Sequence, residues 1–180
     1  MGYSSRMMSS FQVFLAQLGR RLAPDESPAP EELQTIAKEL LALCQTSTFN
    51  AELFPAAEVG KEHLHVLAIS DTGGPSVYLV SDGVGVTSPP HEHQTWAVIV
   101  GVRGVERNIQ YRRLPGDHRQ VVEQGVVDVG TGEYLCMAEA DIHATDVVGD
   151  QPSYHVHLYG RALSALPAFA ERCFVAQLGA

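Results

Sequence analysis

Hydrophobic residues follow a helical period in the first quarter of the chain. Between residues 8 and 22 they recur at the 3.6-residue spacing of an amphipathic helix, at Phe11, Phe14, Leu15, Leu18 and Leu22. A second helix is predicted from about 30 to 45, where the same period runs through Leu33, Ile36, Ala37, Leu40, Leu41 and Cys44. Pro30 and the acidic pair that follows it suit a first helical turn. We expect both helices to pack against the remainder of the protein; a helix pair that binds a partner is the alternative.

From residue 63 onward the period changes to two, which is typical of strands. Gly- and Pro-containing turns separate the expected strands, which are 63–69, 77–80, 97–100, 105–112, 121–124, 126–129, 133–137 and 154–160. Residues 141–143 are expected to form a corner. Short strands at spacings near ten residues favour an all-β sandwich or barrel. We therefore predict one domain overall, with a helical segment over 1–48 and a barrel over 49–180.

Charge and cysteine content exclude several classes of function. The 180-residue chain has a net charge of −9 and a pI of about 5.2. Without a basic stripe, such a chain is not expected to bind nucleic acid or anionic membranes. Its three cysteines are far apart and form no CxxC pair, so neither a zinc ribbon nor a disulfide framework is predicted. With no apparent signal peptide or membrane-spanning stretch, we expect a location in the reducing cytoplasm.

The candidate chemistry centres on two histidines, His91 and His93, that follow Pro89 and Pro90. Residues two apart on a strand point to the same face, so both imidazoles can reach one metal ion. The prolines cannot donate to a sheet, which marks a strand entry or a rim. Taken alone, the pair is either a metal clip or two exposed side chains without a role.

Two segments resemble the motifs of the cupins, which are small double-stranded β-helix barrels that hold a metal inside. Residues 85–104 resemble the first motif, with Gly85, the His91–His93 pair and Gly104 in their places. Residues 132–143 resemble the second motif and end on His143. No glutamate ligand follows the pair, since Trp96 or Ala97 stands at that position. The resemblance implies a cupin barrel with three histidine ligands.

A site of three histidines without a carboxylate resembles the cysteine dioxygenase superfamily of thiol dioxygenases, and the likeness spans residues from about 60 to 165. It implies ferrous iron on His91, His93 and His143. The reaction would oxidise a small thiol, of the cysteine or 3-mercaptopropionate type, to its sulfinate with O2. Another metal-dependent cupin oxygenase or isomerase, or a non-enzymatic ligand-binding cupin, is the alternative. Oligomeric state stays open, although homodimers through barrel edges are common among cupins.

The strand 154–160 places His155, His157 and Tyr159 on one face by its period of two. In that superfamily the matching residues are Ser, His and Tyr, and they form a hydrogen-bonded chain that ends beside the metal. The resemblance implies catalytic roles for all three, with His155 in place of the serine. His155 could instead offer a fourth metal ligand, and purely structural roles for the histidine and tyrosine are the remaining alternative.

Two departures from the superfamily concern its cross-link and its substrate clamp. Val98 stands where related enzymes carry a cysteine that cross-links to the tyrosine, so no cross-link is expected. Related enzymes bind the substrate carboxylate with an arginine upstream of the motifs. The corresponding region of this chain is 61–65, and it contains no arginine. Arg161 and Trp96 are the candidates for substrate binding that lie near the motifs in sequence. The alternatives are that Arg161 is only a surface charge and that Trp96 only packs in the core.

Overall fold

Two long helices precede the strands in the computed structural model, which describes residues 3–23, 26–71 and 73–177. Helix α1 covers Tyr3–Arg21 and helix α2 covers Pro30–Cys44, so both predicted helices are confirmed. The first helix begins earlier than predicted because Met7, which is buried, extends the apolar stripe by one turn toward the N-terminus. In the described part of the chain, no helix is both long enough and apolar enough to cross a membrane.

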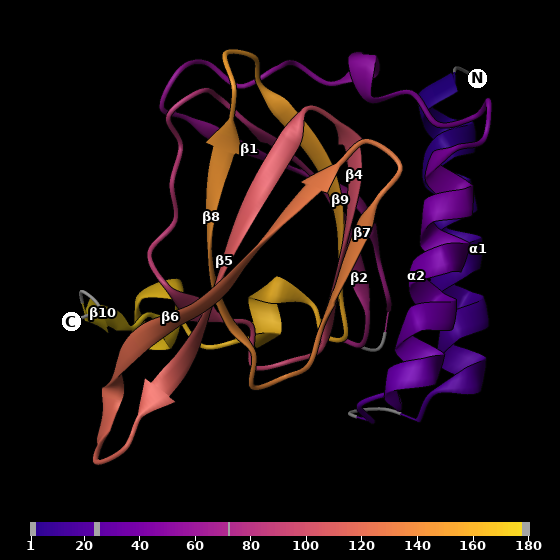
Figure 1. Ribbon diagram of the computed structural model, residues 1–180. Helices are drawn as coiled ribbons and strands as arrows, with labels where there is room; N and C mark the ends of the chain where they lie inside the picture. The colour runs from indigo at the N-terminus through magenta and orange to yellow at the C-terminus, as the bar shows by residue number, and fades with distance from the viewer. Residues whose placement is uncertain (1–2, 24–25, 72, 178–180) are drawn as a thin grey trace.

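Ten strands follow the helices (Figure 1). Their bounds are β1 Glu62–Ile69, β2 Ser76–Asp82, β3 His91–Glu92, β4 Ala97–Arg103, β5 Val105–Leu114, β6 Asp117–Gly130, β7 Tyr134–Met137, β8 Ile142–Val148, β9 Ser153–Tyr159 and β10 Val175–Gln177. Three short 3-10 helices cover Ala51–Leu53, Leu163–Ala165 and Phe169–Arg172.

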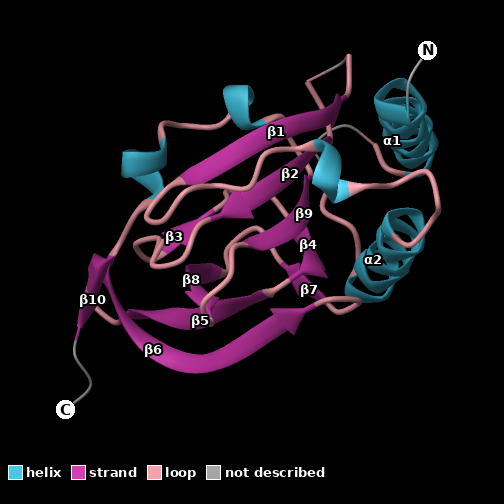
Figure 2. Ribbon diagram, turned by 90° about the horizontal axis from the view of Figure 1, so that it is seen from above, coloured by secondary structure: helices cyan, strands magenta, loops and turns pink. Residues whose placement is uncertain are grey.

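The strands form two five-stranded sheets that face each other as the walls of a barrel (Figure 2). One sheet has the order β1-β2-β9-β4-β7, and the other has the order β10-β6-β5-β8-β3. Among the described strands, only the pair β10 and β6 is parallel. The predicted all-β barrel with an N-terminal helical segment is confirmed.

Two strand predictions were wrong. Residues 117–130 form one long strand, because the extra residue Gln124 is absorbed as a bulge between the register pairs Gln110–Gly125 and Tyr111–Glu123. The expected corner at 141–143 is instead the start of β8. That strand has little alternation in sequence, but it is paired on one side with β5 and on the other with β3.

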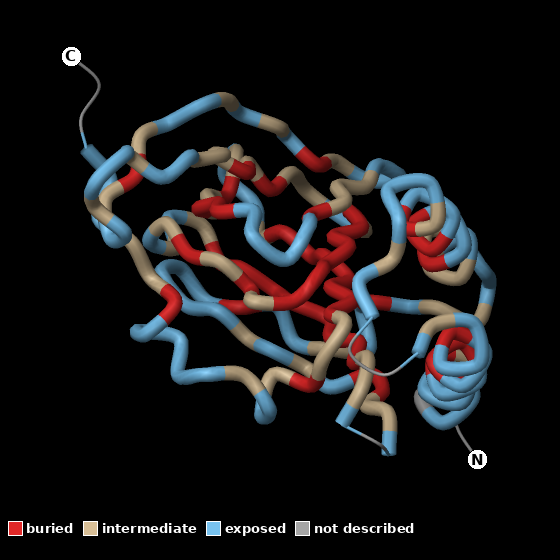
Figure 3. Tube along the Cα trace, turned by 90° about the horizontal axis from the view of Figure 1, so that it is seen from below, coloured by how far each residue is buried: buried red, intermediate tan, exposed pale blue. Residues whose placement is uncertain are grey.

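The helices cover the outer face of the first sheet. Phe11 and Leu18 of α1 and Ile36 of α2 pack against a set of side chains that includes Val156 and Leu158 of β9. Figure 3 shows the buried residues on the inner faces of the helices and through the barrel. Because side chains alternate along β9, the residues between these two and beyond them face the barrel interior.

Candidate metal centre

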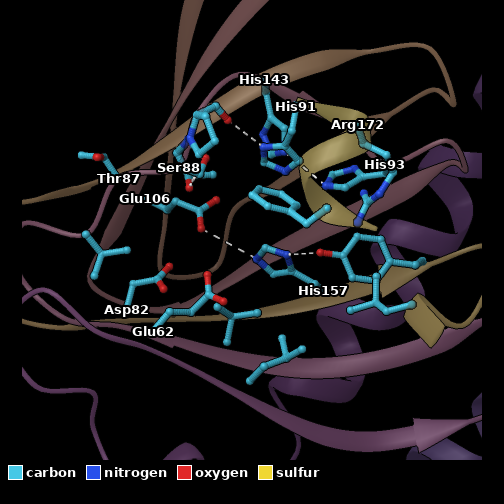
Figure 4. Close-up of a pocket in the computed structure, with 18 of the residues that line it drawn as sticks. Glu62, Asp82, Thr87, Ser88, His91, His93, Glu106, His143, His157 and Arg172 are labelled. Carbon is cyan, nitrogen blue, oxygen red and sulfur yellow. Dashed lines mark hydrogen bonds and ion pairs between the residues drawn. The ribbon is translucent and has the colours of Figure 1, made fainter. Parts of the chain in front are cut away.

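Three histidines, on or next to two neighbouring strands, converge inside the barrel (Figure 4). His91 on β3 is the register partner of His143 on β8, and His93 follows β3 directly. All three side chains are buried, and one nitrogen from each lies within 4.8 Å of the others. The structure therefore brings together the three side chains that were predicted as metal ligands.

Local chain geometry explains why His91 and His93 form a short, separate strand end. Pro89 and Pro90 cannot extend the hydrogen-bonded ladder before it. After it, Gln94 has a φ of 54°, the left-handed conformation that ends a strand, and its side chain donates to Glu92 at 3.0 Å. The short strand β3 is thereby bounded on both sides, and His91 and His93 lie on it and directly after it.

Hydrogen bonds set which nitrogen each of two imidazoles presents. The Nδ1–H of His91 donates to the carbonyl oxygen of Pro89 at 3.0 Å, and that of His143 donates to Oδ1 of Asn108 at 2.7 Å. Both rings therefore present a bare Nε2. Nε2 of His143 lies 3.3 Å from Nε2 of His93. Two nitrogens bound to one ion at ~2.1 Å are about 3.0–3.4 Å apart in octahedral or tetrahedral geometry, so this spacing fits a shared metal.

Burial keeps the three imidazoles neutral, as metal ligands must be. It lowers the pKa of His91 to about 4. The hydrogen bond to the Pro89 carbonyl raises this pKa by a smaller amount, and the charge of Arg172 lowers it. Burial also holds the pKa values of His93 and His143 well below the ordinary value, and the neighbouring histidines add to the shift of each. The donor set thus fits a divalent ion, and imidazole nitrogen suits zinc, iron, copper and nickel alike.

Tyr159 and His157 lie beside these ligands. Nδ1 of His157 is 3.0 Å from the Tyr159 hydroxyl, and the Tyr159 ring centroid is 4.9 Å from that of His93. Burial, followed by the charges of Glu106 and Glu62, raises the pKa of Tyr159 above its ordinary value. The phenol therefore keeps its proton at neutral pH and can donate it to a group in the cavity.

His155 shares the face of His157 and Tyr159, as its position in the strand predicts, but it lies away from the three ligands. Its side chain is buried, and its Nε2–H donates to the carbonyl oxygen of Val129 at 3.2 Å. Nδ1 lies 3.8 Å from Oε2 of Glu106. Among the described residues the metal-binding cluster consists of His91, His93 and His143, so His155 is not a fourth ligand.

Glu106 is a functional candidate that the sequence analysis missed. It is 1% exposed; its Oε1 accepts a bond from Nδ2 of Asn108 at 3.0 Å, and its Oε2 lies 3.7 Å from Nε2 of His157. Burial alone raises the pKa of this carboxyl, but His155 and His157 outweigh burial and lower it to about 2. Glu106 and Asn108 are two apart on β5, and this polar pair on one strand face was the available signal.

The contacts join into one chain of polar groups from a ligand to the tyrosine. It runs from His143 through Asn108, Glu106 and His157 to Tyr159. Three of its four links are hydrogen bonds of 2.7–3.0 Å, and the Glu106–His157 link is an ion-pair distance of 3.7 Å. A change of charge at Tyr159 therefore affects the orientation and charge of the groups near His143, and a change at His143 affects those near Tyr159.

A cavity of about 480 Å³ opens beside the histidines. Its lining includes the three ligands, His157, Tyr159, Glu106, Asp82, Glu62, Phe169 and Arg172. The Arg172 side chain is buried, its Nε donates to the Pro167 carbonyl at 3.1 Å, and its Nη1 donates to the Glu92 carbonyl at 2.9 Å. Arg172 lies far from the motifs along the chain, so no pattern in the sequence pointed to it.

The structure does not place Trp96 and Arg161 in this cavity. Trp96 belongs to the core between the helices and the sheet, and its Nε1–H donates to the Glu26 carbonyl at 3.3 Å. Arg161 lies in the same outer region, in a small pocket together with Trp96. Their predicted contact with a substrate at the histidines is therefore not supported by the geometry.

No protein-family model matches the chain, and no curated protein is detectably similar to it in sequence. Among solved structures, it is similar to a cupin superfamily protein from Desulfitobacterium hafniense, with 18% identity and a TM-score of 0.48 over 62% of this chain and 87% of that chain. A Klebsiella pneumoniae protein with a double-stranded β-helix domain gives 13% identity and a TM-score of 0.49 over 65% and 86%. Oxalate oxidase bound to the substrate analogue glycolate is also similar, with 20% identity and a TM-score of 0.48 over 63% and 59%.

The pairing of β3 with β8 in the barrel explains the position of the three histidines but does not assign a reaction. At 13–20% identity the likeness concerns the fold alone, and it does not distinguish thiol dioxygenases from other cupins. Any assignment of chemistry has to come from the side chains inside this barrel.

Proposed function

We propose that this protein is a cupin and a ferrous-iron-dependent dioxygenase that oxidises a small thiol to its sulfinate. The observation that carries the proposal is the convergence of three neutral histidines beside the Tyr159–His157 pair. In the overall reaction, R–SH and O2 give R–SO2H: both oxygen atoms bond to sulfur, which is oxidised as O2 is reduced.

His91, His93 and His143 would hold the metal, since they offer three imidazole nitrogens and no carboxylate. A ferrous ion held there would supply a positive charge and open positions for a thiolate and O2. Three neutral ligands leave the charge of a divalent ion undiminished, and this favours the thiolate over the thiol. All three histidines are buried, which limits their contact with bulk water.

Tyr159 and His157 are the residues of the chain that would handle protons. The Tyr159 hydroxyl reaches the cavity next to His93, and its buried phenol is a proton donor at neutral pH. His157 holds that hydroxyl at 3.0 Å and is itself next to the Glu106 carboxylate. This arrangement supports a role in which Tyr159 donates a hydrogen bond to an oxygen atom bound in the cavity.

Metal analysis with a small-thiol panel tests the proposal. Protein loaded with Fe(II) without oxygen is expected to consume one O2 per thiol and to release a sulfinate, whereas zinc-loaded protein is expected to be inactive. His143→Ala should lose the metal, while the exposed His118→Ala should keep it. Tyr159→Phe should bind iron normally and turn over about 10²-fold more slowly.

Two outcomes would contradict the proposal. Iron-loaded protein that consumes no O2 with cationic, neutral or anionic small thiols is not a thiol dioxygenase. Metal content that is unchanged in His143→Ala would show that the three histidines are not the ligands. Activity with manganese or nickel on a substrate without sulfur would instead identify another type of cupin oxygenase or isomerase.

A further inference from the structure

Three carboxylates gather at the end of the cavity away from His93 and Arg172 (Figure 4). Glu62 comes from β1, Asp82 from β2 and Glu106 from β5. Glu62 and Asp82 are register partners, so their side chains leave the same face of the sheet next to each other. Like charges in this position are destabilising unless a positive group lies between them.

Asp82 is the unusual member of this group. Its side chain is only 3% exposed, and Oδ1 has no hydrogen-bond partner. No ion pair joins it to a lysine or arginine among the described residues. Burial, together with Glu106 and Glu62, raises the pKa of Asp82 to about 7. Since buried carboxylates are nearly always paired, an unpaired one that lines a cavity indicates a missing donor.

The spacing of these oxygens favours a polyatomic cation over a metal ion. A bound metal ion needs several oxygens that converge on one point. Among the described residues only the three histidines bring ligand atoms within 4.8 Å of one another, so the carboxylates do not converge in this way. A protonated amine carries three N–H donors that point in different directions and can serve separated acceptors.

We propose that Glu62, Asp82 and Glu106 form a binding site for a protonated amine, with Asp82 as its principal acceptor. The identity of the substrate as an aminothiol rests on the proposed function. Charge across the cavity agrees with such a ligand, because Arg172 lies at the histidine end, where a thiolate would bind, and the carboxylates lie at the other end (Figure 4). The ligand that matches both ends is a short aminothiol.

Three two-carbon thiols of different charge test this site on protein loaded with Co(II), which reports thiolate binding through a sulfur-to-cobalt absorption band. The probes are 2-aminoethanethiol, 2-mercaptoethanol and mercaptoacetate. Wild-type protein is expected to bind the amine roughly tenfold more tightly than the neutral thiol, as one charge-assisted hydrogen bond implies. Asp82→Asn should remove this preference, leave the neutral thiol unchanged and strengthen binding of mercaptoacetate.

Two further variants make the comparison specific. Asp128→Asn removes the same charge from an exposed ion pair with Arg107 on the outer surface and should behave like wild type. Glu62→Gln, at an exposed position of the cavity rim, should weaken binding of the amine by a smaller factor. An amine preference that survives in Asp82→Asn, or an equal loss of affinity for all three thiols, would overturn the proposal.

The failure of the proposed function gives a different result. If no thiol changes the cobalt spectrum of the wild type, sulfur does not bind at the histidines. The amine site is then decided by propylammonium chloride, which should raise the melting temperature of wild type above that in equal potassium chloride, but should not do so for Asp82→Asn. Equal effects of the two salts on wild type would exclude the amine site.

Discussion

Nδ1 of His143 lies 2.7 Å from Oδ1 of Asn108, and this contact makes a metal-ligand candidate depend on a residue of another strand. The amide of Asn108 is itself held by Glu106, to which its Nδ2 donates at 3.0 Å. Outer partners of this kind fix the tautomer and the direction of a ligating histidine. The contact therefore makes Asn108 a positioning residue for the proposed metal.

Replacing Asn108 by leucine keeps much of the side-chain volume and removes both hydrogen bonds. We expect the affinity for Zn(II), measured by competition with a coloured chelator, to fall about 10–100-fold. Arg107→Gln is the control, because Arg107 is the next residue on β5 and pairs with Asp128 on the outer surface. If Asn108→Leu folds and binds zinc as tightly as wild type does, the contact has no role in holding the ligand.

Glu106 is expected to make the protein sensitive to acid. Its pKa falls from 4.5 to about 2 on folding, so it contributes stability above pH 4.5 and loses that contribution as the pH falls toward 2. Glu106→Gln should therefore be less stable than wild type at pH 7, and the gap in the free energy of unfolding should narrow between pH 5 and pH 3. Urea unfolding at these three pH values measures the gap, with the exposed Glu123→Gln as control. A gap that is the same at all three pH values would contradict the assignment of charge.

Asp82 should show the opposite dependence on pH. Its pKa rises from 3.8 to about 7 on folding. The protonated Asp82 therefore contributes stability that is fully present below pH 3.8 and is lost as the pH rises through 7. In protein without ligand, Asp82→Asn should thus be more stable than wild type at pH 8, and the gain should shrink toward pH 4. Urea unfolding at pH 8 and pH 4.5 checks this. A gain that grows toward low pH would show that the carboxylate is paired after all.

Arg172 joins the C-terminal segment to the segment that carries His91 and His93, through the Pro167 and Glu92 carbonyl oxygens. Arg172→Ala should lower the free energy of unfolding by about 1.5–3 kcal/mol, the cost of buried hydrogen bonds from a charged donor. It should also weaken zinc binding, because Glu92 lies between His91 and His93. Arg119 donates to the Glu171 and Cys173 carbonyls from an exposed position, so Arg119→Ala is expected to have a smaller effect. Equal effects of the two changes would contradict the special role of Arg172.

Gly101 allows two backbone segments to approach closely at the end of β4. A Cβ at this residue would lie 2.0 Å from the carbonyl oxygen of Gly130. Gly101→Ala should therefore destabilise the protein by about 1–3 kcal/mol or more in urea unfolding. Gly125 is the control, since the nearest atom to its Cβ would be 3.8 Å away. Gly125→Ala is expected to leave stability unchanged or to raise it by up to ~1 kcal/mol.

Local patterns along the sequence were sufficient for the helices, most strands and the pair His91 and His93. A period of 3.6 or 2 is a property of neighbouring residues, and it directly predicts which side chains share a face. For that reason His155, His157 and Tyr159 were placed correctly on one side of β9, and His91 was correctly grouped with His93. His143 came from the resemblance to cupins, which encodes the pairing of two distant strands.

Only the tertiary structure decided what surrounds these residues. Glu106, Asn108, Asp82 and Arg172 reach the cavity from elements far apart in the chain, and neither spacing nor composition brings them together. Tertiary packing also took Trp96 and Arg161 out of the cavity, although they are near the motifs in sequence. The sequence alone determined the barrel and the pair His91 and His93, because periodicity is local, and the resemblance to cupins added His143. Folding decided the charges and hydrogen bonds around those ligands, because they depend on strand register and burial.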